Sequence, residues 1–211
     1  MREPLIAIVD YGVGNLASVR KALVAVGARA ELVRDLATLR GATAIVLPGV
    51  GNFGYCSREF HRYGFAPELR GARERGVPIL GICVGMQLLF EGSEEDRGEP
   101  GLGFLAGRVV QMENVPRLPQ IGWNALGLAG AHPWLRDVRD GDHFYFVHSY
   151  VPKPVDPREL LGTVEYGETR CAIAGAENLL GVQFHPEKSG ANGLRLLSAF
   201  VGATTRQPVP S

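Results

Sequence analysis

The order of apolar and polar positions in the first 90 residues predicts alternating strands and helices. Apolar runs that suit buried strands stand at 5–9, 30–33, 44–47 and 77–80. Helical stripes are predicted at 16–26, 66–75 and 86–90. Asn15 is a candidate N-cap of the first helix, and Gly27 would end it. Asp35 is a candidate cap of a further short helix. This alternation predicts a parallel sheet with helices on both faces, whose site lies at the carboxyl ends of the strands.

The second half of the chain has a different pattern. Short strands, mostly antiparallel, are predicted at 143–151, 160–166, 170–174 and 179–184, and a last helix at 190–201. Residues 92–103 are charged and glycine-containing, and predict a loop. We therefore expect an α/β fold: a mostly parallel sheet flanked by helices, with a small antiparallel portion in the C-terminal half. Residues 1–202 would form a single domain, and 203–211 a flexible tail.

Composition narrows the possible partners. The 211 residues are 45% hydrophobic, and 22 basic residues balance 22 acidic ones, which argues against nucleic acid or an anionic membrane as the main partner. The cysteines, Cys56, Cys83 and Cys171, are odd in number and have no C-x-x-C spacing, so a disulfide framework or a zinc site has little support. No apolar run is long enough for a secretory or membrane segment. We therefore expect a cytoplasmic protein.

A strand-to-helix turn at 81–85, with the sequence G-I-C-V-G, carries the first candidate chemistry. The pattern matches the nucleophile elbow, with cysteine in place of serine, and the two glycines allow close approach of strand and helix. The thiol of Cys83 would lie at a helix N-terminus, which favours the nucleophilic thiolate. On these residues alone, a buried structural cysteine between two packing glycines is an equal alternative.

A second motif, H-P-E at 185–187, follows the last predicted strand. Pro186 favours an extended conformation at His185, and residues two apart in an extended chain point the same way. Glu187 can therefore orient the imidazole of His185. Alone, this tripeptide is better explained as a solvated loop. Together with Cys83 it gives a nucleophile, a base and an orienting carboxylate, so we favour catalysis.

A third motif, P-G-V-G at 48–51, follows another predicted strand. Glycines on both sides of Val50 let a peptide plane rotate at low cost, so that a backbone N–H could face an oxyanion. The N–H of Val84 would be the second donor. Without the other motifs, an ordinary strand-to-helix turn is the better explanation of this segment.

Taken together, the three motifs resemble the signatures of the triad-type (class I) glutamine amidotransferases, in the same order and spacing. Residues 10–16, 119–124, 144–150 and 185–189 further resemble the glutaminase subunits of imidazole glycerol phosphate synthase, a branch of that family. The resemblance covers nearly the whole chain. It implies a flavodoxin-like fold and hydrolysis of L-glutamine to glutamate and ammonia through a cysteinyl thioester. No metal or other cofactor is implied.

The resemblance also implies individual roles. Cys83 would attack the glutamine side chain, His185 would transfer protons, and Glu187 would orient His185. Oxyanion donors would come from Val50, Gly51 and Val84. The substrate-binding positions would be Gly49, Gln87, Glu95, Ser149 and Tyr150.

The implied partner is a (β/α)₈-barrel cyclase subunit, in a heterodimer. It would use the ammonia to make imidazole glycerol phosphate and aminoimidazole carboxamide ribotide in histidine biosynthesis. Asn15, Trp123, Tyr145 and Lys188 match positions at or near the subunit interface. From the residues alone, Lys188 could equally be a solvated charge and Trp123 a core residue.

Three alternatives remain at this point. The first is a glutaminase serving another synthase, such as one that makes aminodeoxychorismate, GMP or pyridoxal phosphate. The second is a stand-alone cysteine hydrolase or peptidase on a flavodoxin-like fold. The third is a non-catalytic binding module. Segments 10–15, 119–124 and 144–150 favour the imidazole glycerol phosphate branch over the first alternative, and the presence of Cys83, His185 and Glu187 argues against the third.

Overall fold

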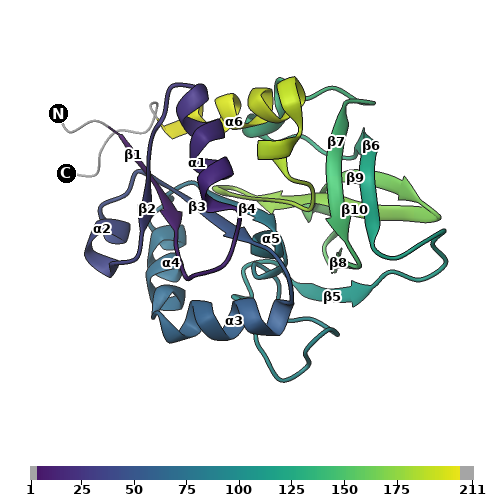
Figure 1. Ribbon diagram of the computed structural model, residues 1–211, viewed down its shortest axis with the longest axis horizontal. Helices are drawn as coiled ribbons and strands as arrows, with labels where there is room; N and C mark the ends of the chain where they lie inside the picture. The colour runs from purple at the N-terminus through teal and green to yellow at the C-terminus, as the bar shows by residue number, and fades with distance from the viewer. Residues whose placement is uncertain (1–3, 205–211) are drawn as a thin grey trace.

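A computed structural model describes residues 4–204, which are built around one large mixed sheet (Figure 1). The strands of this sheet follow one another in the order β2-β1-β3-β4-β11-β10-β9-β6-β7. The parallel half consists of β2 (Arg29–Val33), β1 (Leu5–Val9), β3 (Ala44–Gly49), β4 (Ile79–Cys83) and β11 (Leu179–Val182). The antiparallel half consists of β10 (Glu168–Ala176), β9 (Leu160–Tyr166), β6 (Gln120–Leu128) and β7 (His143–His148). A separate two-stranded sheet pairs β5 (Gly107–Gln111) with β8 (Tyr150–Pro154).

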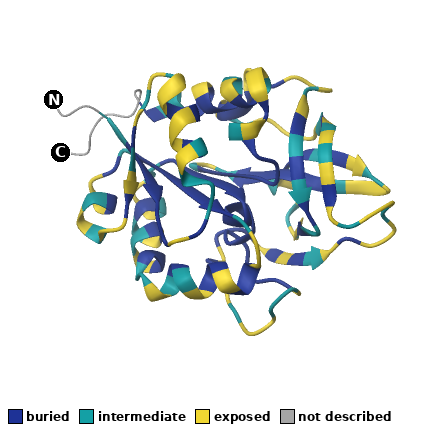
Figure 2. Cartoon of the chain, viewed as in Figure 1, coloured by how far each residue is buried: buried dark blue, intermediate teal, exposed yellow. Residues whose placement is uncertain are grey.

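Helices cover both faces of the parallel half. Helices α1 (Leu16–Ala25) and α6 (Gly190–Thr204) lie on one side, and α3 (Phe53–Arg62) and α4 (Phe65–Glu74) lie on the other (Figure 1). Strands β3, β4 and β11 are buried along their length, the edge strand β2 is partly exposed, and the helices expose their outer faces (Figure 2). Strands covered on both faces are apolar throughout, which is why the runs at 5–9 and 44–47 contain so few polar residues.

Local sequence explains where several helices begin and end. The side chain of Asp35 accepts a hydrogen bond from the Thr38 N–H (2.7 Å) and so caps α2 (Leu36–Arg40). Gly27 follows α1 with a φ of 86°, the left-handed conformation that commonly ends a helix. Asn15 stands at the N-cap position of α1, but its side chain makes no capping bond.

The fold class is as expected, and the antiparallel part is larger than we expected. Within the described residues the main sheet has four parallel and four antiparallel pairings. The strand expected at 143–151 is divided at Ser149 into β7 and β8, which belong to different sheets. Among the α-helices and strands of the described residues, three were not anticipated: α3, β5 and β6; nor were the short 3₁₀ helices Pro133–Leu135, Pro157–Glu159 and Pro186–Lys188.

The C-terminal helix is also longer than its sequence pattern suggested. It continues to Thr204, two residues into the segment expected to be a tail, and the remainder of that expected tail, 205–211, lies outside the described residues. Among residues 4–204, none of the helices combines the length and the apolar character needed to cross a bilayer.

Candidate active site

The carboxyl ends of the parallel strands border a cleft of about 640 Å³. Most of the residues singled out from the sequence line this cleft, although they come from distant parts of the chain. Its lining consists of Gly14, Asn15, Val50, Gly51, Cys83, Val84, Gln87, Glu95, Pro119, Val147, His148, Ser149, Tyr150, His185 and Lys188. Four of the sequence-predicted residues do not line it: Gly49, Trp123, Tyr145 and Glu187.

Cys83 stands at the turn between β4 and the short helix α5 (Val84–Gln87), with φ 55° and ψ −115°. The backbones around it are in close contact. A Cβ added to Gly85 would lie 1.8 Å from the Leu47 carbonyl oxygen of β3, and one added to Gly81 would lie 2.9 Å from the Met86 Cα. Only glycine fits at either place, which is the physical reason for the G-x-C-x-G pattern.

His185 and Glu187 form a buried pair directly after β11. The Nδ1–H of His185 donates to Glu187 Oε1 at 2.8 Å, and both side chains are almost completely buried. Burial by itself lowers the pKa of His185, but the neighbouring Cys83 thiol and the Glu187 carboxylate outweigh it and raise the pKa to about 9. Within residues 4–204 the Nε2 atom of His185 has no hydrogen-bond partner, so no bond joins it to Cys83 Sγ in this conformation.

Two glutamine side chains connect the elbow to the neighbouring strands. Gln183 Nε2 donates to Cys83 Sγ at 3.7 Å. Gln87 Nε2 donates to Gln183 Oε1 and to the Tyr150 carbonyl oxygen, each at 3.1 Å. Sequence reasoning missed Gln183. Its signal was a single polar residue inside the apolar run 179–184, at the carboxyl end of a parallel strand.

The loop after β3 is held from both of its sides. The Tyr11 hydroxyl donates to the Pro48 carbonyl oxygen at 2.5 Å, and the Cys56 thiol donates to the Val50 carbonyl oxygen at 3.4 Å. Gly51 has a φ of 88°. A Cβ on Gly49 would lie 2.7 Å from the Gly85 N atom, so this glycine is required for β3 to pack against the elbow.

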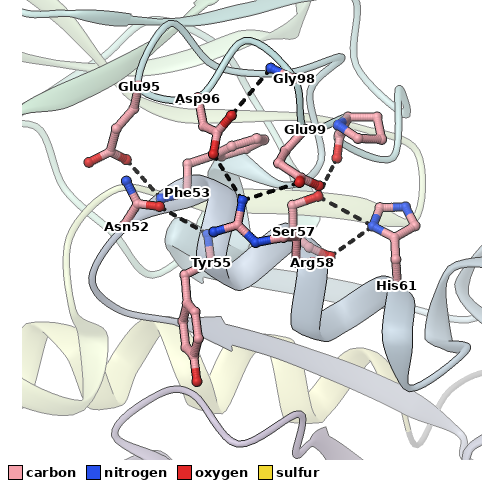
Figure 3. A network of polar contacts seen from close by, with 11 residues as sticks. Asn52, Phe53, Tyr55, Ser57, Arg58, His61, Glu95, Asp96, Gly98 and Glu99 are labelled. Carbon is pink, nitrogen blue, oxygen red and sulfur yellow. Dashed lines mark hydrogen bonds and ion pairs between the residues drawn. The ribbon is translucent and has the colours of Figure 1, made fainter.

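Glu95 reaches the cleft from the loop that precedes β5, and this loop is tied to helix α3 (Figure 3). One carboxylate oxygen of Glu95, Oε2, accepts the Phe53 N–H at the start of α3, at 2.7 Å. Further along α3, Arg58 Nη1 lies 3.0 Å from Asp96 Oδ2 and 3.1 Å from Glu99 Oε1. The loop therefore keeps a fixed position relative to α3, and so relative to the 48–51 loop that leads into this helix.

An exposed cluster of aromatic and cationic groups lies beside the cleft. Trp123 is 53% exposed, and its ring packs edge-on against Tyr145, with ring centroids 6.1 Å apart. Lys188 Nζ lies 5.8 Å from the centroid of the Tyr145 ring. Lys188 and Asn15 also line the cleft. Trp123 is thus a surface residue, and the core-packing alternative for it does not apply.

The described part of the chain contains no group of three or more His, Cys, Asp or Glu side chains that could hold a metal ion. The three cysteines are unpaired and buried. Burial raises the pKa of Cys171 to about 12, and it also raises that of Cys56 to about 12, so neither thiol ionises readily.

Comparison with known proteins finds glutamine amidotransferases both among family models and among curated relatives. The model of the family "Glutamine amidotransferase class-I" matches residues 7–202. The imidazole glycerol phosphate synthase subunit HisH of Symbiobacterium thermophilum is 46% identical over 193 residues, covering 92% of this chain and 91% of the relative. HisH of Thermococcus kodakarensis is 45% identical over 205 residues, covering 93% of this chain and 98% of the relative.

Solved structures are similar in fold at lower identity. One described as a crystal structure of glutamine amidotransferase has a TM-score of 0.75 at 22% identity, and covers 95% of this chain and 98% of its own. The PurLQS structure from Thermotoga maritima also has a TM-score of 0.75 at 22% identity, with coverage of 96% and 99%. At these identities the likeness shows the fold alone.

Proposed function

The chain belongs to the class-I glutamine amidotransferase family and, within it, to the HisH subunits of imidazole glycerol phosphate synthase, and from this we propose the chemistry of its cleft. Glutamine binds in the cleft, Cys83 hydrolyses it to glutamate and ammonia, and the ammonia is used by a separate synthase subunit. The observation that carries this proposal is the position of Cys83, at a sharp turn in the cleft that His185 also lines, with Glu187 bonded to His185 behind the cleft wall.

The reaction proceeds in two halves. The Cys83 thiolate attacks the side-chain amide carbon of glutamine, and the Nε2–H of protonated His185 donates to the departing nitrogen, which leaves as ammonia. The resulting thioester is then attacked by water, whose proton is taken by the now neutral His185, and glutamate leaves. Glu187 keeps His185 in one orientation and stabilises its protonated form, which agrees with the raised pKa of His185.

The negative charge that develops on the substrate oxygen requires backbone donors. We assign these to the N–H of Val84, at the start of α5, and to the loop at Val50 and Gly51. The left-handed φ of Gly51 and the absence of a side chain on Gly49 support this assignment, because they allow the loop to lie directly against the elbow.

The substrate head group is assigned to the opposite wall of the cleft. The Glu95 carboxylate binds the α-ammonium group: its Oε2 is occupied by the Phe53 N–H, which leaves its other oxygen for the substrate. The backbone at Ser149 and Tyr150 binds the α-carboxylate. Gln87 supports this wall, because it donates to the Tyr150 carbonyl oxygen. The interruption of the strand at Ser149, between β7 and β8, supports the assignment, because Ser149 and Tyr150 line the cleft at this point.

The partner we propose is a (β/α)₈-barrel cyclase that makes imidazole glycerol phosphate and aminoimidazole carboxamide ribotide in the cytoplasm. It docks on the face that carries Asn15, Trp123, Tyr145 and Lys188. Aromatic side chains such as Trp123 and Tyr145 are enriched at protein interfaces, and Trp123 is exposed on this face. We propose that the described residues form one catalytic domain, which extends to Thr204 at the end of α6.

Measurement of glutamate release, with and without the cyclase and its nucleotide ligand, tests this function. We expect weak activity of the chain alone, strong activation by the liganded cyclase, and none in Cys83→Ala under either condition. Cys171→Ala is the matched control, because Cys171 lies on β10 and does not line the cleft. Full activity of the single chain would exclude the dependence on a partner, and persistent activity of Cys83→Ala would exclude Cys83 as the nucleophile.

Two further measurements address the alternatives. Complementation of a histidine auxotroph, with the matching cyclase present, separates this synthase from those that make aminodeoxychorismate, GMP or pyridoxal phosphate. Modification of Cys83 by the glutamine analogue diazo-oxo-norleucine separates an enzyme from a binding module, for which the thiol would stay unmodified.

A further inference from the structure

Two buried acceptor atoms stand next to each other in the β6–β7 pair. Gln120, at the start of β6, is the direct cross-strand partner of His148, at the end of β7. Gln120 is fully buried and His148 is 7% exposed. Directly opposed residues in an antiparallel pair point to the same face, with Cβ atoms about 4.5–5.5 Å apart. The two side chains therefore share one buried region.

The protonation state of His148 follows from its contacts. Its Nδ1 lies 2.9 Å from the Tyr150 carbonyl oxygen, and because a carbonyl oxygen only accepts, Nδ1 carries the proton. The pKa of His148 is lowered to about 4, mainly by burial; the Tyr150 carbonyl opposes this shift and the nearby charge of His185 adds to it. The ring is thus neutral near neutral pH, and Nε2 carries a lone pair.

Neither acceptor is satisfied within the described residues. Neither His148 Nε2 nor Gln120 Oε1 has a hydrogen-bond partner there. The amide nitrogen of Gln120 is occupied, because it donates to Asn124 Oδ1 at 2.9 Å. A buried acceptor without a donor costs about 1–3 kcal/mol. Two such acceptors, side by side on opposed residues, define a place for a small molecule that supplies several N–H or O–H donors.

The position of this pair relates it to the cleft. His148 lines the cleft together with Cys83, and so does Pro119, which directly precedes Gln120. His148 and Cys83 line the same cleft, so a molecule released at Cys83 can reach His148, and Gln120 lies directly opposite His148 on the neighbouring strand. Both acceptors are uncharged and buried, so they favour a neutral donor over a cation.

We propose that Gln120 Oε1 and His148 Nε2 form a binding site for ammonia, the product that leaves when Cys83 forms its thioester. The inference rests on the proposed function, because only the hydrolysis of glutamine supplies ammonia at this place. Ammonia has three N–H donors and can bond both acceptors at once. The site would retain ammonia on the protein after it leaves the thioester, and would keep it apart from bulk solvent.

Binding can be measured on the full chain without turnover. The chain is labelled with ¹⁵N in its histidine rings, and the His148 Nε2 resonance is followed during addition of ammonium chloride at one alkaline pH, where part of the ammonium is free ammonia. Potassium chloride and tetramethylammonium chloride, which have no N–H groups, are added to parallel samples at the same ionic strength. We expect a saturable shift with ammonium alone. An equal response to all three salts, or no saturation, would mean that the pair holds a water molecule or is closed by a direct Gln120–His148 bond.

A substitution tests the second acceptor. Gln120→Met keeps the length of the side chain and removes its carbonyl oxygen, so we expect binding to weaken about fivefold, the factor that corresponds to one hydrogen bond of about 1 kcal/mol. Gln111→Met, on an exposed position of β5, is the matched control and should bind as the wild type does. Unchanged binding in Gln120→Met would overturn the site. If that variant fails to fold, the comparison of the three salts on the wild type decides the question alone.

Glutamate release in the presence of the cyclase is measured on the same preparations, which separates the two proposals. If the wild type forms no glutamate, the proposed function is wrong whatever the titration shows. If it forms glutamate and the His148 resonance does not respond to ammonium, the function stands and the ammonia site is wrong.

Discussion

Replacing Glu187 by glutamine would test the electrostatics of the site. The substitution keeps the shape of the side chain and removes the charge that faces His185 Nδ1 at 2.8 Å. Burial lowers the pKa of His185, and it is the Cys83 thiol and the Glu187 carboxylate that raise it. Without the carboxylate, less opposes the effect of burial, which disfavours the charged imidazolium. The pKa of His185 should therefore fall well below its wild-type value.

The size of the effect follows from the shift. The pKa of His185 is raised from 6.5 to about 9, and one unit corresponds to about 1.4 kcal/mol, so the shift is linked to at most about 3.5 kcal/mol of stability. Because the folded protein binds this proton more tightly than the unfolded chain, the contribution is complete below pH 6.5. It is lost as the pH rises through about 9.

Urea unfolding at a series of pH values, from below 6.5 to above 9, measures this contribution. We expect the wild type to lose stability over this range, and the loss to be much smaller in Glu187→Gln. Glu74→Gln, at an exposed position of α4, controls for the general effect of removing one carboxylate and should follow the wild type. Parallel pH profiles for wild type and Glu187→Gln would refute the reasoning, and so would an unchanged His185 pKa in an NMR titration.

Three further predictions concern packing, capping and the exposed cluster. Gly85→Ala should lose about 3 kcal/mol or more in urea unfolding, because its Cβ would meet the Leu47 carbonyl oxygen at 1.8 Å. Gly41→Ala, whose Cβ would have no contact closer than 3.7 Å, should change stability by less than about 1 kcal/mol, and equal losses in the two variants would contradict this account. Asn52→Ala removes the cap that accepts the Tyr55 N–H and should cost about 1 kcal/mol by the same assay, whereas no loss would show that the cap is dispensable. Trp123→Ala should alter the unfolding free energy by less than about 1 kcal/mol but weaken cyclase binding by about 2 kcal/mol or more in calorimetry, and unchanged affinity would remove Trp123 from the interface.

The parallel half of the fold could be predicted because its signals are local. Strands β1 and β3 are continuous apolar runs, and strands buried on both faces must have this pattern. The elbow is also encoded locally, since the close approach of β3, β4 and α5 admits only glycine at 81 and 85. Cys83 was a candidate because it lies at the glycine-flanked turn after an apolar strand. His185 and Glu187 were candidates because of the extended H-P-E segment.

The missed elements have weaker local signals. Helix α3 has a capping residue, Asn52, and buries Phe53, Cys56 and Phe60 at helical spacing, but Gly54 in its first turn weakens the helical signal. A Cβ at Gly54 would meet the Asp96 carboxylate, so this glycine serves a tertiary contact that the sequence does not reveal. The helix formed despite the low intrinsic propensity of glycine.

The antiparallel half depends on long-range pairing, which local patterns do not specify. The run 143–151 is continuous in apolar and aromatic character, yet β7 pairs with β6 and β8 with β5, so the chain leaves one sheet at Ser149 and enters another. The polar side chains around the cleft share this property. Gln183 and His148 differ from other buried polar residues only in what the fold brings next to them.

The backbone at Cys83 has a consequence for stability. A non-glycine residue at φ 55° and ψ −115° costs on the order of 1–3 kcal/mol, and glycine at the same place would relieve most of this cost. The folded chain is thus expected to be more stable with glycine at position 83 than with Cys83, the proposed nucleophile. A protein that changed under pressure for stability alone would exchange this cysteine for glycine, so its presence at such a turn marks the position as one kept for chemistry.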